Sequence, residues 1–111
     1  MAEPKVDRRP LFCAEVRAAL RRVESQAITL GPGVCAPRHR HPCDVVGCVL
    51  SGTIRYAREN GQEVLLRSGD AFLEPAGAVV LHFDNASTCE PAEFVAFYLM
   101  ERQGPTIELL G

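Results

Sequence analysis

The sequence has no apolar run long enough to span a membrane, and its charges nearly balance, with a formal net charge of -2 over 111 residues. A membrane-spanning helix needs about 20 consecutive apolar residues, so helical membrane proteins are excluded. A chain with so little net charge has no electrostatic reason to bind DNA, RNA or an anionic membrane. The first ten residues are charged and contain proline, without the apolar segment of a secretory signal, so we expect a cytoplasmic protein.

Cysteine pairs and the common catalytic motifs are also lacking. The five cysteines include no Cys-x-x-Cys pair, and an odd number without an export signal favours reduced thiols over a disulfide framework. The chain has no glycine-rich phosphate loop, no Gly-x-Ser-x-Gly turn and no His-Glu-x-x-His helix. The chemistry that depends on these motifs is therefore poorly supported.

The sequence does contain a regular series of short apolar or alternating segments separated by turn residues. They predict strands over residues 26–30, 45–50, 53–58, 64–66, 71–73, 79–83 and 93–100. Asn60 and Gly61 form the dipeptide of a tight hairpin turn, and turn residues recur about every ten residues. The pattern predicts a single all-β domain, a sandwich or barrel, over residues 24–103.

Two segments flank the predicted barrel. Residues 1–23 form an N-terminal extension, in which residues 11–22 fit either a weak helical pattern or irregular chain leading into the first strand. Residues 104–111 form a C-terminal tail. The extension could add a strand to the sheet of a neighbouring subunit, and unpaired edge strands need such cover, so the expected assembly is a homodimer.

The most informative tetrapeptide is His39-Arg40-His41-Pro42. Residues two apart in a strand project from the same face, so two imidazoles can share one metal ion. Two histidines are too few ligands for a metal site, and further ligands must come from elsewhere in the chain. The alternative is a pair of surface histidines in a basic loop.

The spacing around this pair resembles the first motif of the cupin family. That motif is Gly, five residues, His-x-His, three or four residues, Glu, six residues, Gly. In this sequence the matching positions are Gly33, His39, His41, Val45 and Gly52. The segment that ends at Gly52 is similar to the strand and turn that close the motif in that family.

A segment further along the chain resembles the second cupin motif. Its opening matches Gly69, five residues, and then Pro75-x-Gly77, and residues 84–87 look like its closing region. Together the two motifs cover roughly residues 24–100. The resemblance implies a double-stranded β-helix, or jelly-roll, barrel, whose relatives hold a divalent metal ion and are commonly dimeric.

The resemblance also implies four ligand positions, and valine fills two of them. Val45 stands at the Glu position of the first motif, and Val80 stands at the His position of the second. His82 lies two residues beyond Val80 and would share its face on a regular strand, displaced by about 6.6 Å. His82 is therefore a candidate third ligand, and the alternative is a buried histidine that is hydrogen-bonded inside the barrel.

Three other side chains lie near these motifs. Cys43 is a candidate ligand because residues 39, 41 and 43, each two apart, would project from the same face of a strand. A thiolate suits zinc, copper(I) or iron. The alternative is an inert cysteine in a turn. Asp44 would need one bulged residue to reach the Glu position. Glu74 would line the barrel mouth or face solvent.

The functional expectation follows from the resemblance. It implies a metal-binding barrel that acts on or binds a small organic molecule, and it permits an enzyme of the dioxygenase, isomerase or lyase kind, with its catalytic residues unassigned. The cofactor would be a divalent Fe, Ni, Mn, Zn or Cu ion, since histidine ligands suit several metals. The alternatives are a non-catalytic module that binds a metabolite or metal, and a structural cupin whose partner is another protein chain; a fold alone does not choose among them.

Overall fold

The computed structural model describes residues 6–16 and 19–111, and no helix occurs among them. The strands are β1 (Arg22–Leu30), β2 (His39–Arg40), β3 (Asp44–Ser51), β4 (Thr53–Arg58), β5 (Val64–Arg67), β6 (Ala71–Glu74), β7 (Val80–Asn85), β8 (Ala92–Met100) and β9 (Glu108–Leu109). The all-β prediction is therefore confirmed. Within the described residues, no helix is long and apolar enough to cross a membrane.

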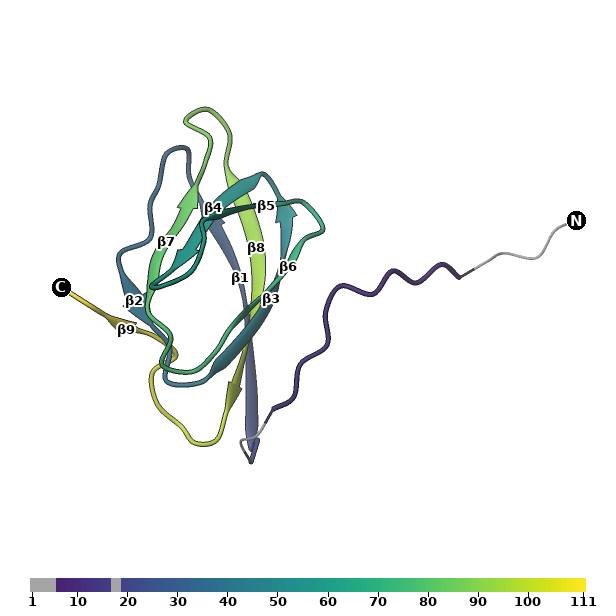
Figure 1. The fold of residues 1–111 in the computed structure, drawn as a ribbon, viewed down its shortest axis with the longest axis vertical. Helices are drawn as coiled ribbons and strands as arrows, with labels where there is room; N and C mark the ends of the chain where they lie inside the picture. The colour runs from purple at the N-terminus through teal and green to yellow at the C-terminus, as the bar shows by residue number, and fades with distance from the viewer. Residues whose placement is uncertain (1–5, 17–18) are drawn as a thin grey trace, which may run out of the picture.

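The strands form two antiparallel sheets that face each other (Figure 1). One sheet has the strand order β1-β8-β3-β6, and the other has the order β5-β4-β7-β2-β9. Neighbours in a sheet are mostly distant in sequence, as when β8 inserts between β1 and β3. This interleaved order is the jelly-roll arrangement, in which the chain winds repeatedly between the two sheets.

The core lies between the sheets because the strands alternate inward and outward residues. In the β3–β8 pairing the buried partners are Val45 with Tyr98 and Val49 with Phe94. Between them lies Gly47, and a Cβ there would collide with the Phe72 ring and the backbone of β8. The period-2 pattern of the sequence thus determines which face of each strand is buried.

Aromatic rings fill the centre of the barrel. Phe72, Phe83 and Phe94 pack edge to face, with ring centroids 4.7–6.0 Å apart. Tyr56 joins this cluster at 5.6 Å from Phe83. Aromatic pairs at such separations stabilise a core beyond the area that they bury.

The predicted turns occur where the sequence places them. Asn60 has a positive φ of 65° in the hairpin between β4 and β5. Gly52, between β3 and β4, has a φ of 81°, and a Cβ there would approach the backbone of Pro91 and Ala92 within 3.0 Å. A side chain is therefore excluded at Gly52 by conformation and by space.

The chain ahead of the barrel is an arm of irregular structure. The beginning of the arm extends away from the barrel in Figure 1, while the segment 12–16 lines a cleft together with barrel residues. Of residues 11–22, those that the structure describes form no helix before β1 begins at Arg22. Of the two structures expected for residues 11–22, a helix or irregular chain, residues 11–16 and 19–21 have the irregular one. Residues 17 and 18 lie outside the described part of the chain. The predicted pairing of this segment with a neighbouring subunit stays a prediction.

The segment expected to be a C-terminal tail carries a strand. Its residues Glu108 and Leu109 form β9, which pairs with β2. The Arg40 guanidinium donates two hydrogen bonds to the Glu108 carboxylate, at 2.9 and 3.0 Å. The Leu110 amide donates to the Arg38 carbonyl at 2.9 Å. These contacts hold the end of the chain across β2, beside the His39-x-His41 pair.

Candidate metal centre

His39 and His41 both lie inside the barrel. His39 is in β2 and His41 directly follows it, and each side chain is almost completely buried. Their ring centroids are 4.9 Å apart with the planes nearly perpendicular. The two imidazoles therefore project from the same face of the strand, as expected for residues two apart.

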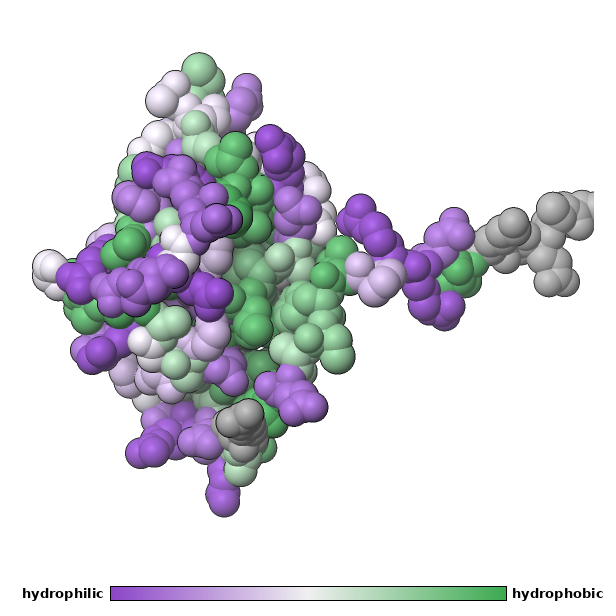
Figure 2. Space-filling model, in the orientation of Figure 1, coloured by the Kyte–Doolittle hydropathy of each residue, from purple (hydrophilic) through white to green (hydrophobic). Residues whose placement is uncertain are grey.

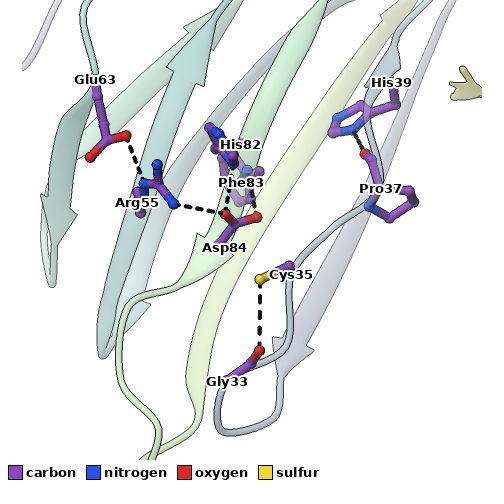
Figure 3. A network of polar contacts seen from close by, with 9 residues as sticks. All are labelled: Gly33, Cys35, Pro37, His39, Arg55, Glu63, His82, Phe83 and Asp84. Atoms are coloured by element: carbon purple, nitrogen blue, oxygen red, sulfur yellow. Dashed lines mark hydrogen bonds and ion pairs between the residues drawn. The ribbon is translucent and has the colours of Figure 1, made fainter.

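A backbone carbonyl orients each imidazole. His39 Nδ1 lies 2.7 Å from the Pro37 carbonyl oxygen (Figure 3), and His41 Nδ1 lies 2.6 Å from the Thr106 carbonyl oxygen. Because a carbonyl oxygen only accepts, both Nδ1 atoms carry the proton and donate. The neutral form of each ring then presents a free electron pair at Nε2, which is the tautomer that binds metal ions.

The third side chain at this position is Glu74, at the end of β6. In the antiparallel pairing of β3 with β6, Glu74 lies directly opposite Val45, so the two side chains share a face. Glu74 Oε2 lies 2.8 Å from His41 Nε2 and 4.0 Å from His39 Nε2. The Glu74 side chain is only 3% exposed, so it lines the interior and does not face solvent.

The carboxylate and His41 interact strongly without a satisfactory hydrogen bond. Burial opposes the charged form of His41, but the Glu74 carboxylate and the Thr106 carbonyl favour it more, so the pKa of His41 is raised above its usual value. Despite the 2.8 Å separation, Glu74 Oε2 has no hydrogen-bond partner of acceptable geometry. His41 Nε2 and Glu74 Oε2 are therefore close together without being aligned for a hydrogen bond with each other.

This donor set fits a divalent metal ion. Nitrogen and carboxylate ligands bind such ions at about 2.0–2.2 Å, so two ligands of one ion are at most about 4.2–4.4 Å apart. The three donor atoms of His39, His41 and Glu74 all lie within 4.8 Å of one another. A shift of well under 1 Å would therefore bring all three within bonding distance of one ion.

The structure places His82 elsewhere. The β4–β7 pairing shifts register between Val80 and His82, so that Leu81 is an extra residue. This bulge changes the parity of the strand: Val80 is fully buried, whereas the His82 side chain is 40% exposed. His82 Nδ1 instead lies 3.0 Å from Asp84 Oδ2, in the polar network with Arg55 that Figure 3 shows. His82 does not join the group of His39, His41 and Glu74.

Cys43 and Asp44 also lie outside this group. Cys43 is buried, and burial together with the nearby Asp44 charge raises the pKa of its thiol, which keeps the thiol protonated. Asp44 Oδ1 accepts a hydrogen bond from the Ala76 amide at 2.8 Å. Both residues line a cavity of about 450 Å³ at the end of the barrel, beside residues 99–105. The neighbouring cysteine and aspartate therefore contribute to a pocket wall.

Sequence reasoning did not place Glu74 among the ligands. The strand pattern predicts that residues 45–50 and 71–73 are strands, but their register depends on contacts between distant segments. The only available signal is the inward parity of Glu74 with Phe72, a core residue two positions earlier on β6. That parity makes Glu74 an inward carboxylate, which is rare unless the group is paired or binds a cation.

The cupin domain family matches residues 26–98, about two thirds of the chain. The chain belongs to the cupin family. Among solved structures, this cupin is similar to a protein with a double-stranded β-helix domain from Klebsiella pneumoniae, with 26% identity, a TM-score of 0.67 and coverage of 80% of this chain and 75% of the other. None of the curated proteins has a sequence that matches this chain.

Two structures with stated activities share the fold. An oxalate oxidase, solved with the substrate analogue glycolate, is 22% identical, with a TM-score of 0.67 over 79% of this cupin and 46% of the oxidase. A sugar phosphate isomerase of the cupin superfamily from Silicibacter pomeroyi is 25% identical, with a TM-score of 0.62 over 72% of this cupin and 52% of the isomerase. The cupin therefore spans about half the length of these two enzymes.

Proposed function

We propose that this cupin binds a divalent transition metal ion through His39, His41 and Glu74, and that the ion binds or transforms a small organic molecule. One observation carries the proposal. Backbone carbonyls hold both Nδ1 atoms, so both Nε2 atoms are left to coordinate, and they lie 2.8 and 4.0 Å from a buried carboxylate oxygen that has no hydrogen-bond partner. A cation between the two Nε2 atoms and Glu74 Oε2 would satisfy all three donor atoms.

The chemistry of the donor set restricts the cofactor. Two imidazoles and one carboxylate suit Fe, Ni, Mn, Zn or Cu, and this combination leaves coordination positions open. A bound ion would supply Lewis-acid polarisation of an oxygen-containing ligand in those open positions. The carbonyls of Pro37 and Thr106 would keep the histidines in the ligand tautomer. Ligation by His82 or Cys43 stays a prediction, and the His82→Gln variant tests it for His82.

Metal uptake by the site competes with protonation of His41. The Glu74 carboxylate, 2.8 Å from His41 Nε2, and the Thr106 carbonyl hold the pKa of His41 above its usual value despite its burial. Because only the neutral imidazole binds a metal ion, metal affinity should fall as the pH is lowered through that raised value.

The enzyme classes supported by the comparisons are those of the similar structures. One of these structures is an oxidase of a small carboxylic acid and another is a sugar phosphate isomerase, and we propose a small-molecule reaction of the dioxygenase, isomerase or lyase kind. A non-catalytic binding cupin is the second candidate. It is favoured by the valines at two motif positions, Val45 and Val80, which leave the barrel interior more apolar.

Metal analysis tests the proposal directly. Protein purified without a histidine tag should contain, or take up from solution, one divalent ion per chain, measured by elemental analysis and calorimetric titration. The chain has three histidines, so His39→Gln and His41→Gln should each abolish uptake, while the matched variant His82→Gln should retain it. Glu74→Gln should weaken binding, and the exposed Glu63→Gln should not. The proposal is contradicted if none of the divalent ions of Fe, Ni, Mn, Zn and Cu binds the wild-type protein.

A further inference from the structure

Tyr56 presents a hydroxyl group that the metal site does not use. Within the described residues, two buried side-chain polar atoms have no hydrogen-bond partner: the Tyr56 hydroxyl oxygen and Glu74 Oε2. A buried polar group without a partner destabilises the fold, and most such groups in native proteins are satisfied. A metal ion would satisfy Glu74, whereas the Tyr56 hydroxyl still needs an acceptor.

The Tyr56 side chain is buried in the barrel interior, on the sheet opposite the one that carries Glu74. Tyr56 is on β4 and Glu74 is on β6, which belong to the two opposite sheets. The Tyr56 ring reaches across to Phe72, with centroids 6.5 Å apart, and Glu74 is two residues beyond Phe72 on the same face of β6. Tyr56 and Glu74 therefore approach the same part of the core from opposite sides.

The phenol is a donor and not an anion at this position. Burial, and next the negative charge of Glu74, raise the pKa of Tyr56 above its ordinary range. The ring is held by Phe72 and Phe83, with the latter 5.6 Å away in an edge-to-face arrangement. A neutral hydroxyl in these apolar surroundings can gain most from an acceptor that carries negative charge.

The charge of the metal site identifies the class of that acceptor. Two neutral imidazoles and one carboxylate leave a divalent ion with one uncompensated positive charge, and such a charge is costly in a buried site. An anionic ligand with a single negative charge would neutralise it. Because the Tyr56 ring packs against Phe72 and Phe83 in the barrel interior, that ligand must also be small.

We propose that the Tyr56 hydroxyl donates a hydrogen bond to an oxygen atom of a small monocarboxylate that binds beside the metal ion of the His39, His41 and Glu74 group. The inference rests on the proposed metal site and adds the class of its ligand. One carboxylate oxygen satisfies the open position of the ion, and the second accepts the proton of Tyr56. Tyr56 thus selects an oxygen acceptor over an apolar or cationic ligand.

The chain offers a matched control, because it contains two tyrosines and no tryptophan. The Tyr98 hydroxyl already donates to Gln26 Oε1, at 3.4 Å, while its ring lies 5.7 Å from His41. Tyr56→Phe and Tyr98→Phe each remove one oxygen atom near the site. Of these two variants, only Tyr56→Phe removes a hydroxyl that has no partner.

The test uses the full chain loaded with Co(II), whose visible spectrum reports changes in coordination. Co(II) affinity is measured first and alone. Acetate is then titrated, with acetamide as the uncharged analogue and chloride as an anion without oxygen. We expect acetate to change the spectrum of the wild-type protein and to bind Tyr56→Phe roughly 10- to 150-fold more weakly, the effect of losing a hydrogen bond to a charged group. Tyr98→Phe should bind acetate within about twofold of wild type, because its hydroxyl is not used.

Thermal unfolding of the metal-free proteins gives a second readout. Tyr56→Phe should unfold at the same or a higher temperature than wild type, because it loses a buried hydroxyl without a partner. If Co(II) binds normally but acetate binds Tyr56→Phe and wild type equally well, the inference about Tyr56 is wrong and the proposed metal site still stands. The same holds if acetate produces no spectral response in the wild-type protein. Failure to bind Co(II) would overturn the proposed function as well, and that failure is recorded before acetate is added.

Discussion

Glu74 on β6 lies directly opposite Val45 on β3, and both side chains enter the barrel from the same sheet. Val45 stands where the cupin motif has its glutamate, so in this chain the nearest interior carboxylate is displaced by one strand. Opposite residues of an antiparallel pair have Cβ atoms about 4.5–5.5 Å apart. A carboxylate on either strand can therefore reach the same region beside His39 and His41.

This relationship predicts that the carboxylate can be moved between the strands. Glu74→Val should reduce metal affinity by at least tenfold, because it removes a charged ligand and leaves two histidines. The double variant Val45→Glu/Glu74→Val should recover much of that affinity, measured by calorimetric titration with Zn(II). The expectation is contradicted if the double variant binds no better than Glu74→Val while both proteins remain folded by circular dichroism.

The buried pair of His41 and Glu74 predicts that the stability of the metal-free protein depends on pH. The pKa of His41 is raised by folding from an unfolded value near 6.5. Its contribution is therefore fully present below pH 6.5 and is lost as the pH rises through the raised value. The free energy of unfolding of the metal-free protein should therefore fall as the pH rises above 6.5.

Urea unfolding across this pH range checks the sign of the effect. His41→Gln should flatten the profile, because it removes the imidazole whose pKa folding raises. Added Zn(II) should stabilise the protein most at the alkaline end, because the ion competes with the proton for His41. A wild-type stability that rises as the pH increases above 6.5 without metal would contradict this account.

Local rules explain which parts of the fold are predictable. The strands follow from alternation of apolar residues, and the hairpin at Asn60 follows from the Asn-Gly dipeptide, because both signals lie within a few residues of the structure they determine. The His39 and His41 pair is predictable for the same reason. All three features depend on spacing along one segment of chain.

The remaining features depend on contacts between distant segments. Glu74 reaches the site through the β3–β6 register, which no local pattern determines. His82 leaves the interior because Leu81 forms a bulge against β4. The C-terminal strand pairs with β2, where Arg40 binds Glu108, 68 positions later. The cupin resemblance predicts the barrel but not these three departures from it.

The N-terminal arm predicts a dimer in solution. Figure 2 shows apolar side chains gathered where the arm meets the barrel. A cleft of about 230 Å³ there is lined by apolar residues of both parts, among them Phe12, Val16, Val46, Leu73 and Leu99. Phe12 and Val16 are themselves exposed, and a second chain would cover them.

The mass in solution decides this point. Light scattering at micromolar concentration should give twice the mass of one chain, and Phe12→Ser/Val16→Ser should shift it toward the monomer, because the substitutions remove apolar area from the contact. Leu81→Ser, which changes an exposed leucine of the other sheet, is the control and should remain dimeric. A monomeric wild-type protein would refute the prediction.

The end of the chain is predicted to support the metal site through one carbonyl group. The Thr106 carbonyl accepts the Nδ1 proton of His41 at 2.6 Å, and β9 fixes this segment through the pairing of Glu108 with Arg40. Deletion of residues 105–111 should therefore weaken metal binding by about 10- to 100-fold, the usual effect of losing a group that orients a ligand. Thr106→Ala retains the carbonyl and should bind metal like wild type. Arg40→Gln, which loosens β9 without removing it, should fall between the two. Equal Zn(II) affinity in the deletion variant and in Thr106→Ala would show that His41 needs no such support, because its orientation would then come from Glu74 and the packing of Tyr98 alone.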